Sequence, residues 1–233
     1  MRQTRNLLVL SAIALSTGLF VACGGGSSAE SEAASLPTDG ILGELPKVVA
    51  EYEAAEAAAS AKYDELKASD PEKATAFWSD YISQGNSTKF KKETLPAVAK
   101  TLEGKEIPAE LGVQLPMRLS GNFILNDQRQ AFVEGEFTEG ASNDTKILTL
   151  QTVAFDTDGN AIDISPQGSI NFSNYPIEPG KKFTFSIFIS VADYNAAGWA
   201  KLQKIVILDC KSEAYKQAEE QIKATKEAFR NKQ

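Results

Sequence analysis

The sequence contains no histidine and only two cysteines, and these shortages exclude several kinds of site. Without histidine the chain cannot form a Ser-His-Asp or Cys-His catalytic system or a histidine-ligated metal site. A single cysteine besides Cys23 cannot build a thiolate zinc site or a framework of disulfides. Neither G-x-G-x-x-G nor a P-loop pattern occurs. We therefore expect no cofactor, no metal ion and no catalysis by these routes.

Positive charge is also in short supply. The chain has 24 Lys and Arg against 31 Asp and Glu, a formal net charge of −7. Removal of residues 1–22 takes away two arginines and no acidic residue, which changes this charge to −9. Nucleic-acid binding requires basic residues to neutralise phosphates, so we expect no nucleic-acid partner. An acidic surface is not attracted to anionic lipid either, so any membrane attachment needs another means.

The long apolar run LLVLSAIALSTGLFVA occupies residues 7–22 and is too short to span a bilayer. It has 16 residues, against the roughly 20 that a transmembrane helix needs. Arg2 and Arg5 precede it, and a basic start followed by an apolar stretch ending in small residues is typical of a secretory signal peptide. Residues 1–22 are therefore predicted to be a signal peptide. The alternatives are an ordinary cleavage site beside a chance cysteine, or a buried core helix.

The apolar run leads directly into Cys23, and this junction resembles the lipobox of bacterial lipoproteins, with Phe20 where the motif usually has Leu. The resemblance implies that the thiol of Cys23 receives a diacylglyceryl group and that a lipoprotein signal peptidase cuts before it. Two or three acyl chains such as palmitate anchor a protein stably, since each buried methylene contributes about 0.8 kcal/mol. Gly24 replaces the Asp that retains lipoproteins at the inner membrane. This favours the outer membrane or cell surface if the cell is Gram-negative.

The first half of the mature chain is predicted to be a tether followed by helices. Residues 23–43 are rich in Gly, Ser, Ala and Glu and predict a flexible tether. Residues 44–110 carry apolar side chains every three or four positions, which predicts three or four helices. Asp70 and Pro71 are expected to begin the second helix, with Asp70 as its N-cap. Pro96 is expected to kink or split the third.

Residues 116–210 show an apolar period of two, which predicts β-strands. The expected strands lie within MRLSGNFIL, QAFVEGEFT, KILTLQTVAF, KFTFSIFISV and KLQKIVILDC, the last of them buried on both faces. DTDGN and EPGKK predict tight turns. Six or seven short strands in about 95 residues predict an antiparallel β-sandwich, and the chain as a whole is predicted to have an α+β fold.

The stretch FVEGEFTEGASNDTKILTLQTVAFDTDGNAI, followed by YPIEPGKKFTFSI, resembles the Ig-like FxLYD-type domains of bacterial envelope proteins. In that pattern a central strand ends in aromatic-Asp, and a Pro-Gly turn leads into an F-x-F strand. The matching positions are Gly135, Phe155, Asp156, Gly159, Pro179, Gly180, Phe183 and Phe185. Thr152 and Ala154 stand where the family has Phe and Leu. The resemblance implies an Ig-like fold and a non-enzymatic role, and it transfers no functional residues.

Residues 211–233 predict an amphipathic C-terminal helix. Its apolar stripe, expected to pack on the N-terminal helices, consists of Tyr215, Ala218, Ile222 and Phe229. An exposed, partner-binding helix is the alternative. Cys210 follows the apolar run KIVIL and is predicted to be a buried, inert thiol, with an intermolecular disulfide as the alternative.

Tyr194 and Trp199, in the stretch YNAAGWAK, are the candidate partner contacts, because rigid aromatic side chains supply much of the binding energy at interfaces. Trp199 alternatively closes the end of the sandwich. The DTDGN stretch partly matches a calcium loop, but its glycine is the fourth residue instead of the sixth. A hairpin turn is the favoured interpretation of that stretch.

These observations predict a membrane-anchored lipoprotein that acts as a non-catalytic binding or assembly module at the cell envelope. The expected partners are the membrane, through lipid on Cys23, and another envelope protein or a glycan. Two alternatives stay open. An envelope enzyme using acidic residues would require a cleft where Asp and Glu converge, and a small-ligand-binding lipoprotein would require two lobes around a cleft.

Overall fold

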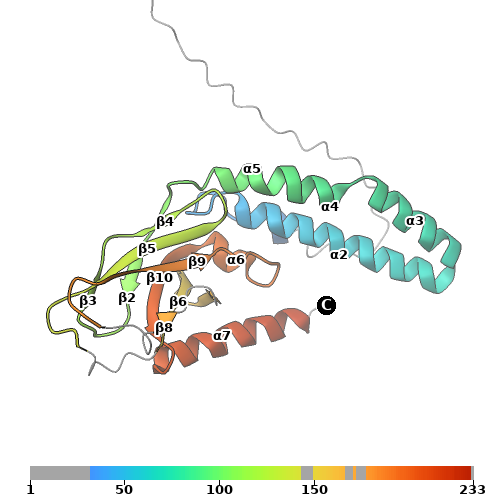
Figure 1. Cartoon of the computed structure of the whole chain (residues 1–233). Helices are drawn as coiled ribbons and strands as arrows, with labels where there is room; N and C mark the ends of the chain where they lie inside the picture. The colour runs from blue at the N-terminus through green and yellow to red at the C-terminus, as the bar shows by residue number, and fades with distance from the viewer. Residues whose placement is uncertain (1–31, 143–148, 166–169, 172–176, 232–233) are drawn as a thin grey trace, which may run out of the picture.

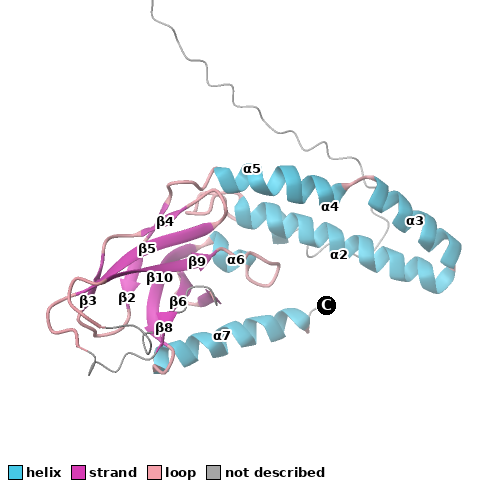
Figure 2. Ribbon diagram, in the orientation of Figure 1, coloured by secondary structure: helices cyan, strands magenta, loops and turns pink. Residues whose placement is uncertain are grey.

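The computed structural model describes residues 32–142, 149–165, 170–171 and 177–231. The predicted signal peptide and Cys23 lie outside the described residues. Helices come first in the described chain, two β-sheets follow, and one further helix ends it (Figure 1; Figure 2 separates helices from strands by colour). The fold is therefore α+β, as predicted.

The N-terminal helices begin with a hairpin formed by α2 (Leu45–Ser69) and α3 (Pro71–Ser83). Asp70 separates the two helices, and its carboxylate accepts a hydrogen bond from the backbone N–H of Lys73 at 3.2 Å. Pro71 follows at the first helical position, where a missing N–H costs nothing. The predicted helix boundary and N-cap are thus confirmed.

The third helical segment is split, as the position of Pro96 predicts. Its pieces are α4 (Asn86–Lys89), a π-helical turn η1 (Phe90–Thr94) and α5 (Leu95–Lys100). Proline has no N–H to donate and crowds the preceding turn, so the regular hydrogen-bond ladder cannot continue through it. Within the part of the chain that the structure describes, no helix is both long and apolar enough to cross a membrane.

Sheet A is built around β5 (Gln130–Phe137) and is antiparallel throughout. β9 (Lys182–Phe188) pairs with one edge of β5. The other edge pairs with β4 (Phe123–Leu125) and β3 (Met117–Leu119), and β1 (Glu106–Ile107) lies outside β4.

Sheet B has the order β2-β10-β6, with β7 and β8 both pairing along the far edge of β6. Its strands are β2 (Ala109–Leu111), β6 (Thr149–Asp156), β7 (Ala161–Ile164), β8 (Ile170–Asn171) and β10 (Leu202–Asp209). β2 runs parallel to β10, and the other pairs are antiparallel. The predicted antiparallel sandwich is therefore mixed at this one pair.

The main core lies between the two sheets. Its strand residues include Ala131, Val133, Phe185 and Ile187 from sheet A and Leu150, Ala154, Ile205 and Ile207 from sheet B. β5 and β9 alternate buried and exposed side chains, whereas β10 is buried on both faces from Ile205 to Leu208, as predicted. Leu45 and Val49 of α2 and Trp199 of α6 (Ala196–Ala200) belong to the same core. The helices and sheets therefore share one hydrophobic core.

Two segments differ from the sequence interpretation. β1 and the first two residues of β2 fall inside residues 44–110, which were predicted to be helical. Strands of two and three residues are too short to show a period of two. Residues 32–43 were assigned to the tether, but Ala33 is 5% exposed and Leu42 1% exposed, both within the main core. Small and isolated apolar residues in a polar stretch are a weak sequence signal for burial.

The C-terminal helix α7 (Glu213–Arg230) forms as predicted but packs elsewhere than expected. Tyr215, Ala218 and Ile222 form a second core with residues of sheet B: Val153, Ala161, Val206 and Leu208. α7 is therefore a third layer on the outer face of sheet B, and the prediction that it packs on the N-terminal helices is wrong. Figure 1 shows it apart from α2, with α6 between the two. The two-sided burial of β10 requires such a cover.

Candidate functional site

The loop between β9 and α6 is held in place by hydrogen bonds that converge on one carbonyl. Buried Asn195 accepts from the N–H of Ala192 at 2.8 Å and donates to the carbonyl of Ser190 at 3.1 Å. The indole N–H of Trp199 donates to the same carbonyl at 3.1 Å. These bonds fix the backbone on both sides of Tyr194.

The two aromatic residues predicted as partner contacts have different surroundings. Trp199 is 0% exposed and lies in the main core, so it closes the sandwich and cannot contact a partner in this structure. Tyr194 is half-buried, and the ammonium of Lys226 from α7 lies 5.0 Å from the centroid of its ring. A cation at this distance from a tyrosine ring is a cation–π contact. Tyr194 alone therefore stays a candidate.

A groove of about 430 Å³ lies along α7 next to this contact. Its apolar lining consists of Ile164 from β7 and Ile222 from α7. The charged lining comes entirely from α7: Glu219, Lys223, Lys226, Glu227 and Arg230. The volume falls in the range of ligand-binding clefts, but the lining differs from the mostly apolar lining of such clefts, because five of its seven residues are charged.

Two cations of the groove, Lys226 and Arg230, differ from the other two cations of α7. Lys216 pairs with Glu213 and Lys223 pairs with Glu227, each at 3.9 Å. Among the described residues, no carboxylate lies within ion-pair distance of Lys226 or Arg230. A helix periodicity of 3.6 places these two side chains on the same face of α7. The sequence analysis missed both, although their spacing of four on an amphipathic helix is visible in the sequence.

Two aspartates around this region have raised pKa values. Burial raises the pKa of Asp163 to about 6, although the N–H of Ile164 and the charge of Lys226 act in the opposite direction. Burial also raises the pKa of Asp193 to about 6, and the charge and hydrogen bond of Glu53 add to the effect. The Glu53 carboxylate accepts from the backbone N–H of Asp193 at 2.6 Å, which ties α2 to the β9–α6 loop. This carboxyl pair does not line the groove.

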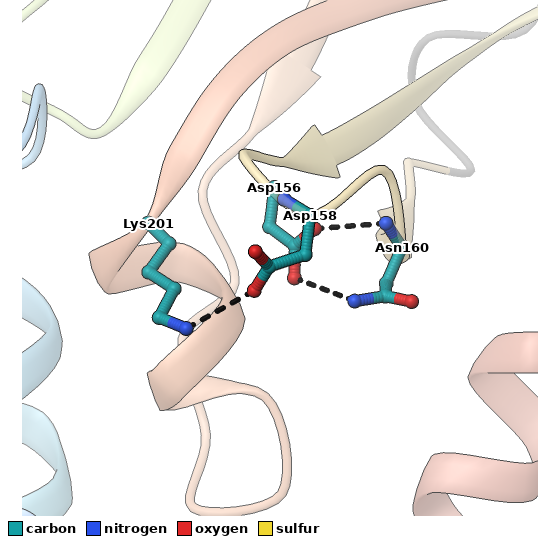
Figure 3. A network of polar contacts seen from close by, with 4 residues as sticks. All are labelled: Asp156, Asp158, Asn160 and Lys201. Atoms are coloured by element: carbon teal, nitrogen blue, oxygen red, sulfur yellow. Dashed lines mark hydrogen bonds and ion pairs between the residues drawn. The ribbon is translucent and has the colours of Figure 1, made fainter.

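The DTDGN stretch forms the hairpin turn between β6 and β7, as predicted (Figure 3). One carboxylate oxygen of Asp156 accepts from the N–H of Asp158 at 2.9 Å and of Asn160 at 2.8 Å, and the other accepts from the Asn160 side-chain amide at 3.1 Å. Asp158 pairs with Lys201 at 3.1 Å. These oxygens are thus used by the turn itself. Gly159 has a φ of +83°, which glycine adopts at little cost.

Cys210 is half-buried beneath α7. Its thiol donates a weak hydrogen bond to the Gln151 side-chain oxygen at 3.5 Å, which also accepts from the Tyr215 hydroxyl at 3.1 Å. Burial raises the pKa of the thiol, and the charges of Asp209 and Glu219 raise it further. A thiol with a raised pKa forms little thiolate and reacts slowly, which agrees with the predicted inert role.

Comparison with known proteins adds no assignment: no family model, no curated protein and no solved structure matches the chain. Within the described ranges, no group of three or more acidic or cysteine side chains is arranged to hold a metal ion. The fold thus defines an α+β protein with a sandwich-like pair of sheets. The groove between α7 and β7 is the surface feature of the described residues that lies next to Tyr194, the remaining candidate contact.

Proposed function

We propose that this protein is a membrane-anchored bacterial lipoprotein that acts as a non-catalytic binding module at the cell envelope, held there by lipid on Cys23. The basic start, the apolar run of residues 7–22 and the lipobox-like junction support the anchor. The acidic composition supports attachment by lipid instead of by a basic surface. In a Gram-negative cell, the residue after Cys23 favours the outer membrane or the cell surface.

The anchor would lie close to the folded part of the protein. Ala33 already belongs to the main core, so ten peptide units separate Cys23 from a fixed position. Even a fully extended chain of that length spans at most about 35 Å. The folded part would therefore begin within about 35 Å of the membrane, which suits a partner in the envelope.

The groove beside α7 is the observation that carries the binding role. It combines two isoleucines, two cations without ion-pair partners among the described residues, and an adjacent half-buried tyrosine. Tyrosine and arginine are the residue types most enriched where binding energy concentrates at protein interfaces. We therefore assign another envelope protein as the partner and the groove as its docking site.

The anchor is tested by metabolic labelling of the full chain with an alkyne analogue of palmitate. We expect labelling and membrane fractionation in the wild type, and loss of both in Cys23→Ala. Cys210→Ala is the matched control, because it removes the other cysteine and should keep both properties. Labelling that survives in Cys23→Ala would refute the lipid assignment.

The docking site is tested by photocrosslinking in cells with p-benzoylphenylalanine at position 194. The control places the same amino acid at Lys62, an exposed residue of α2 far along the helical hairpin. We expect one envelope protein, identified by mass spectrometry, to be captured from position 194 and not from position 62. Its capture should be lost when Lys226→Glu is added. Equal capture from both positions would refute the groove as docking site.

A further inference from the structure

The groove carries a regular row of side chains that defines what its partner must look like. Ile222, Lys226 and Arg230 follow one another at intervals of four residues on α7, and all three line the groove. Since an α-helix rises 1.5 Å per residue, successive members of this row are about 6 Å apart along the helix. The row therefore presents one apolar position and then two positive positions in steps of about 6 Å.

An extended chain can present side chains at close to this spacing. Side chains on the same face of a β-strand are two residues apart, which is about 6.6–6.8 Å. Three alternate residues of an extended segment can thus stand opposite the three members of the row. The order required for complementarity is apolar, then acidic, then acidic.

Charges at the ends of the groove set the direction of such a segment. Glu219 lies one turn before Lys223 and next to Ile222, so an acidic residue of the ligand would meet a like charge at that end. Lys226 and Arg230 lie toward the other end, where Glu227 also lines the groove but is paired with Lys223 at 3.9 Å. The apolar residue of the ligand therefore belongs beside Ile222 and Ile164, and its acidic residues belong toward the C-terminus of α7.

The surroundings of Ile222 and Lys226 favour a ligand that has apolar as well as acidic character. Ile222 is buried against the outer face of sheet B and exposes only its edge to the groove. Lys226 is half-buried and lies over the Tyr194 ring, so its long stem is held in place before any ligand arrives. A preorganised cation loses less conformational entropy on binding than a free lysine does.

We infer that this groove binds an extended acidic segment of the partner protein, with the pattern apolar-x-acidic-x-acidic, through Ile222, Lys226 and Arg230. The inference rests on the proposed function, because it names the kind of partner that the same groove receives. Charge complementarity provides the specificity, and the apolar contact fixes the register.

The probe is a fluorescein-labelled peptide Leu-Ser-Glu-Ser-Glu, whose binding to the full mature chain is followed by fluorescence anisotropy at low salt. The matched peptide Leu-Glu-Glu-Ser-Ser has the same composition and charge but places its acids side by side. We expect the alternating peptide to bind at least tenfold more tightly than the matched one. Equal affinity, or no binding of either peptide at millimolar concentration, would overturn the inference.

Variants of the protein separate specific contacts from general charge attraction. Lys226→Ala with Arg230→Ala is expected to weaken binding of the alternating peptide at least tenfold. Lys216→Ala with Lys211→Ala removes the same charge from outside the groove and should change affinity less than twofold. Lys226→Glu with Arg230→Glu should reverse the preference and bind Leu-Ser-Lys-Ser-Lys. Lys211, Lys216 and Arg230 are exposed and Lys226 is half-buried, so the thermal melts of all variants should be compared with that of the wild type.

The inference and the proposed function fail in different ways. If Cys23 is labelled and position 194 captures an envelope protein, but peptide affinity is unchanged in the Lys226 and Arg230 variant, the acidic-segment inference is wrong and the proposed function stands. If the peptide binds as expected but Cys23 is not labelled, the anchor is wrong and the acidic-segment specificity of the groove stands.

Discussion

The hydroxyl of Thr152 donates a hydrogen bond to the carbonyl oxygen of Ser186 at 3.3 Å, and this contact joins one sheet to the other. Thr152 is fully buried in β6 of sheet B, and Ser186 lies in β9 at the edge of sheet A. Ser165, which is also buried, accepts from the N–H of Phe188 two residues further along the same edge at 3.3 Å. Side chains of β6 and of the residue that follows β7 thus pair with backbone groups along an edge of sheet A. The Thr152 contact accounts for a polar side chain at a fully buried position of β6.

Removal of this hydroxyl tests the link between the sheets. Thr152→Val keeps the shape of the side chain and removes the donor, and we expect the free energy of unfolding to fall by about 1–2 kcal/mol. For a chain of this size, that is a fall in the melting temperature of roughly 2–8 °C. Thr152→Ser keeps the hydroxyl and should lose less stability than Thr152→Val does. A valine variant as stable as the wild type would show that the contact contributes nothing.

Gly135 offers a second test of packing within sheet A. It pairs with Phe183 across β5 and β9, and the phenylalanine ring folds over the glycine. A Cβ atom at Gly135 would lie 2.8 Å from Cζ of that ring and closer still to Cε2. Gly135→Ala is therefore expected to destabilise the protein by about 1–3 kcal/mol through overpacking, measured by urea unfolding.

Two further variants make the Gly135 prediction specific. Gly121→Ala is the control, because a Cβ at Gly121 meets no atom within 4 Å. In a Phe183→Ala background the clash is absent, so Gly135→Ala should lower the free energy of unfolding much less there. An equal cost in both backgrounds would assign the effect to the backbone instead of the ring.

The elements that the sequence predicts well are those with a strong local signal. The N-cap of α3 at Asp70, the break before Pro96 and the DTDGN turn each follow from the stereochemistry of a few adjacent residues. The strand β10 can be recognised as buried on both faces because it has four consecutive apolar residues. A strand with one buried face needs apolar residues only at alternate positions. Local chemistry determines these features wherever the rest of the chain lies.

The features that sequence reasoning misses depend on long-range packing. The apolar stripe of α7 indicates that this face of the helix packs on another apolar surface. Either the N-terminal helices or the outer face of sheet B could provide that surface. Trp199 and Tyr194 are five residues apart in one stretch of mostly small residues, yet Trp199 lies in the core and Tyr194 lies beside Lys226. The groove itself exists only once β7 and α7 have come together.

The contact between Glu53 and Asp193 predicts a dependence of stability on pH. The pKa of Asp193 is raised from 3.8 to about 6 in the folded protein, first by burial and then by Glu53. The folded state therefore binds more protons than the unfolded state between these values, and the stabilisation present below about 3.8 is lost as the pH rises through about 6. Asp193 is partly exposed, so we expect a contribution of roughly 1 kcal/mol after allowance for solvent screening.

Asp193→Asn should remove this contribution. Its free energy of unfolding should exceed that of the wild type at pH 7.5, and the difference should shrink as the pH is lowered to 4. Urea unfolding at a series of pH values measures both. Asp64→Asn, an exposed change on α2, controls for the loss of one negative charge and should keep the wild-type slope. A parallel pair of curves for Asp193→Asn and the wild type would refute the assignment.

The position of α7 on sheet B leads to the last prediction. Ile222 is buried against Val153, Val206 and Leu208, whereas Ala224 is exposed two residues away on the same helix. Ile222→Asp places a carboxylate without a partner in this apolar contact and is expected to destabilise the protein by about 3 kcal/mol or more. Ala224→Asp introduces the same charge in water and should change stability by less than about 0.5 kcal/mol. Hydrogen exchange should show faster exchange along α7 in the Ile222 variant, while the amides of β5 and β9 in sheet A stay protected. If both variants melt like the wild type, α7 does not pack on sheet B. If sheet A loses its protection together with α7, the helix and the sandwich unfold as one unit, and the third layer is an integral part of the fold.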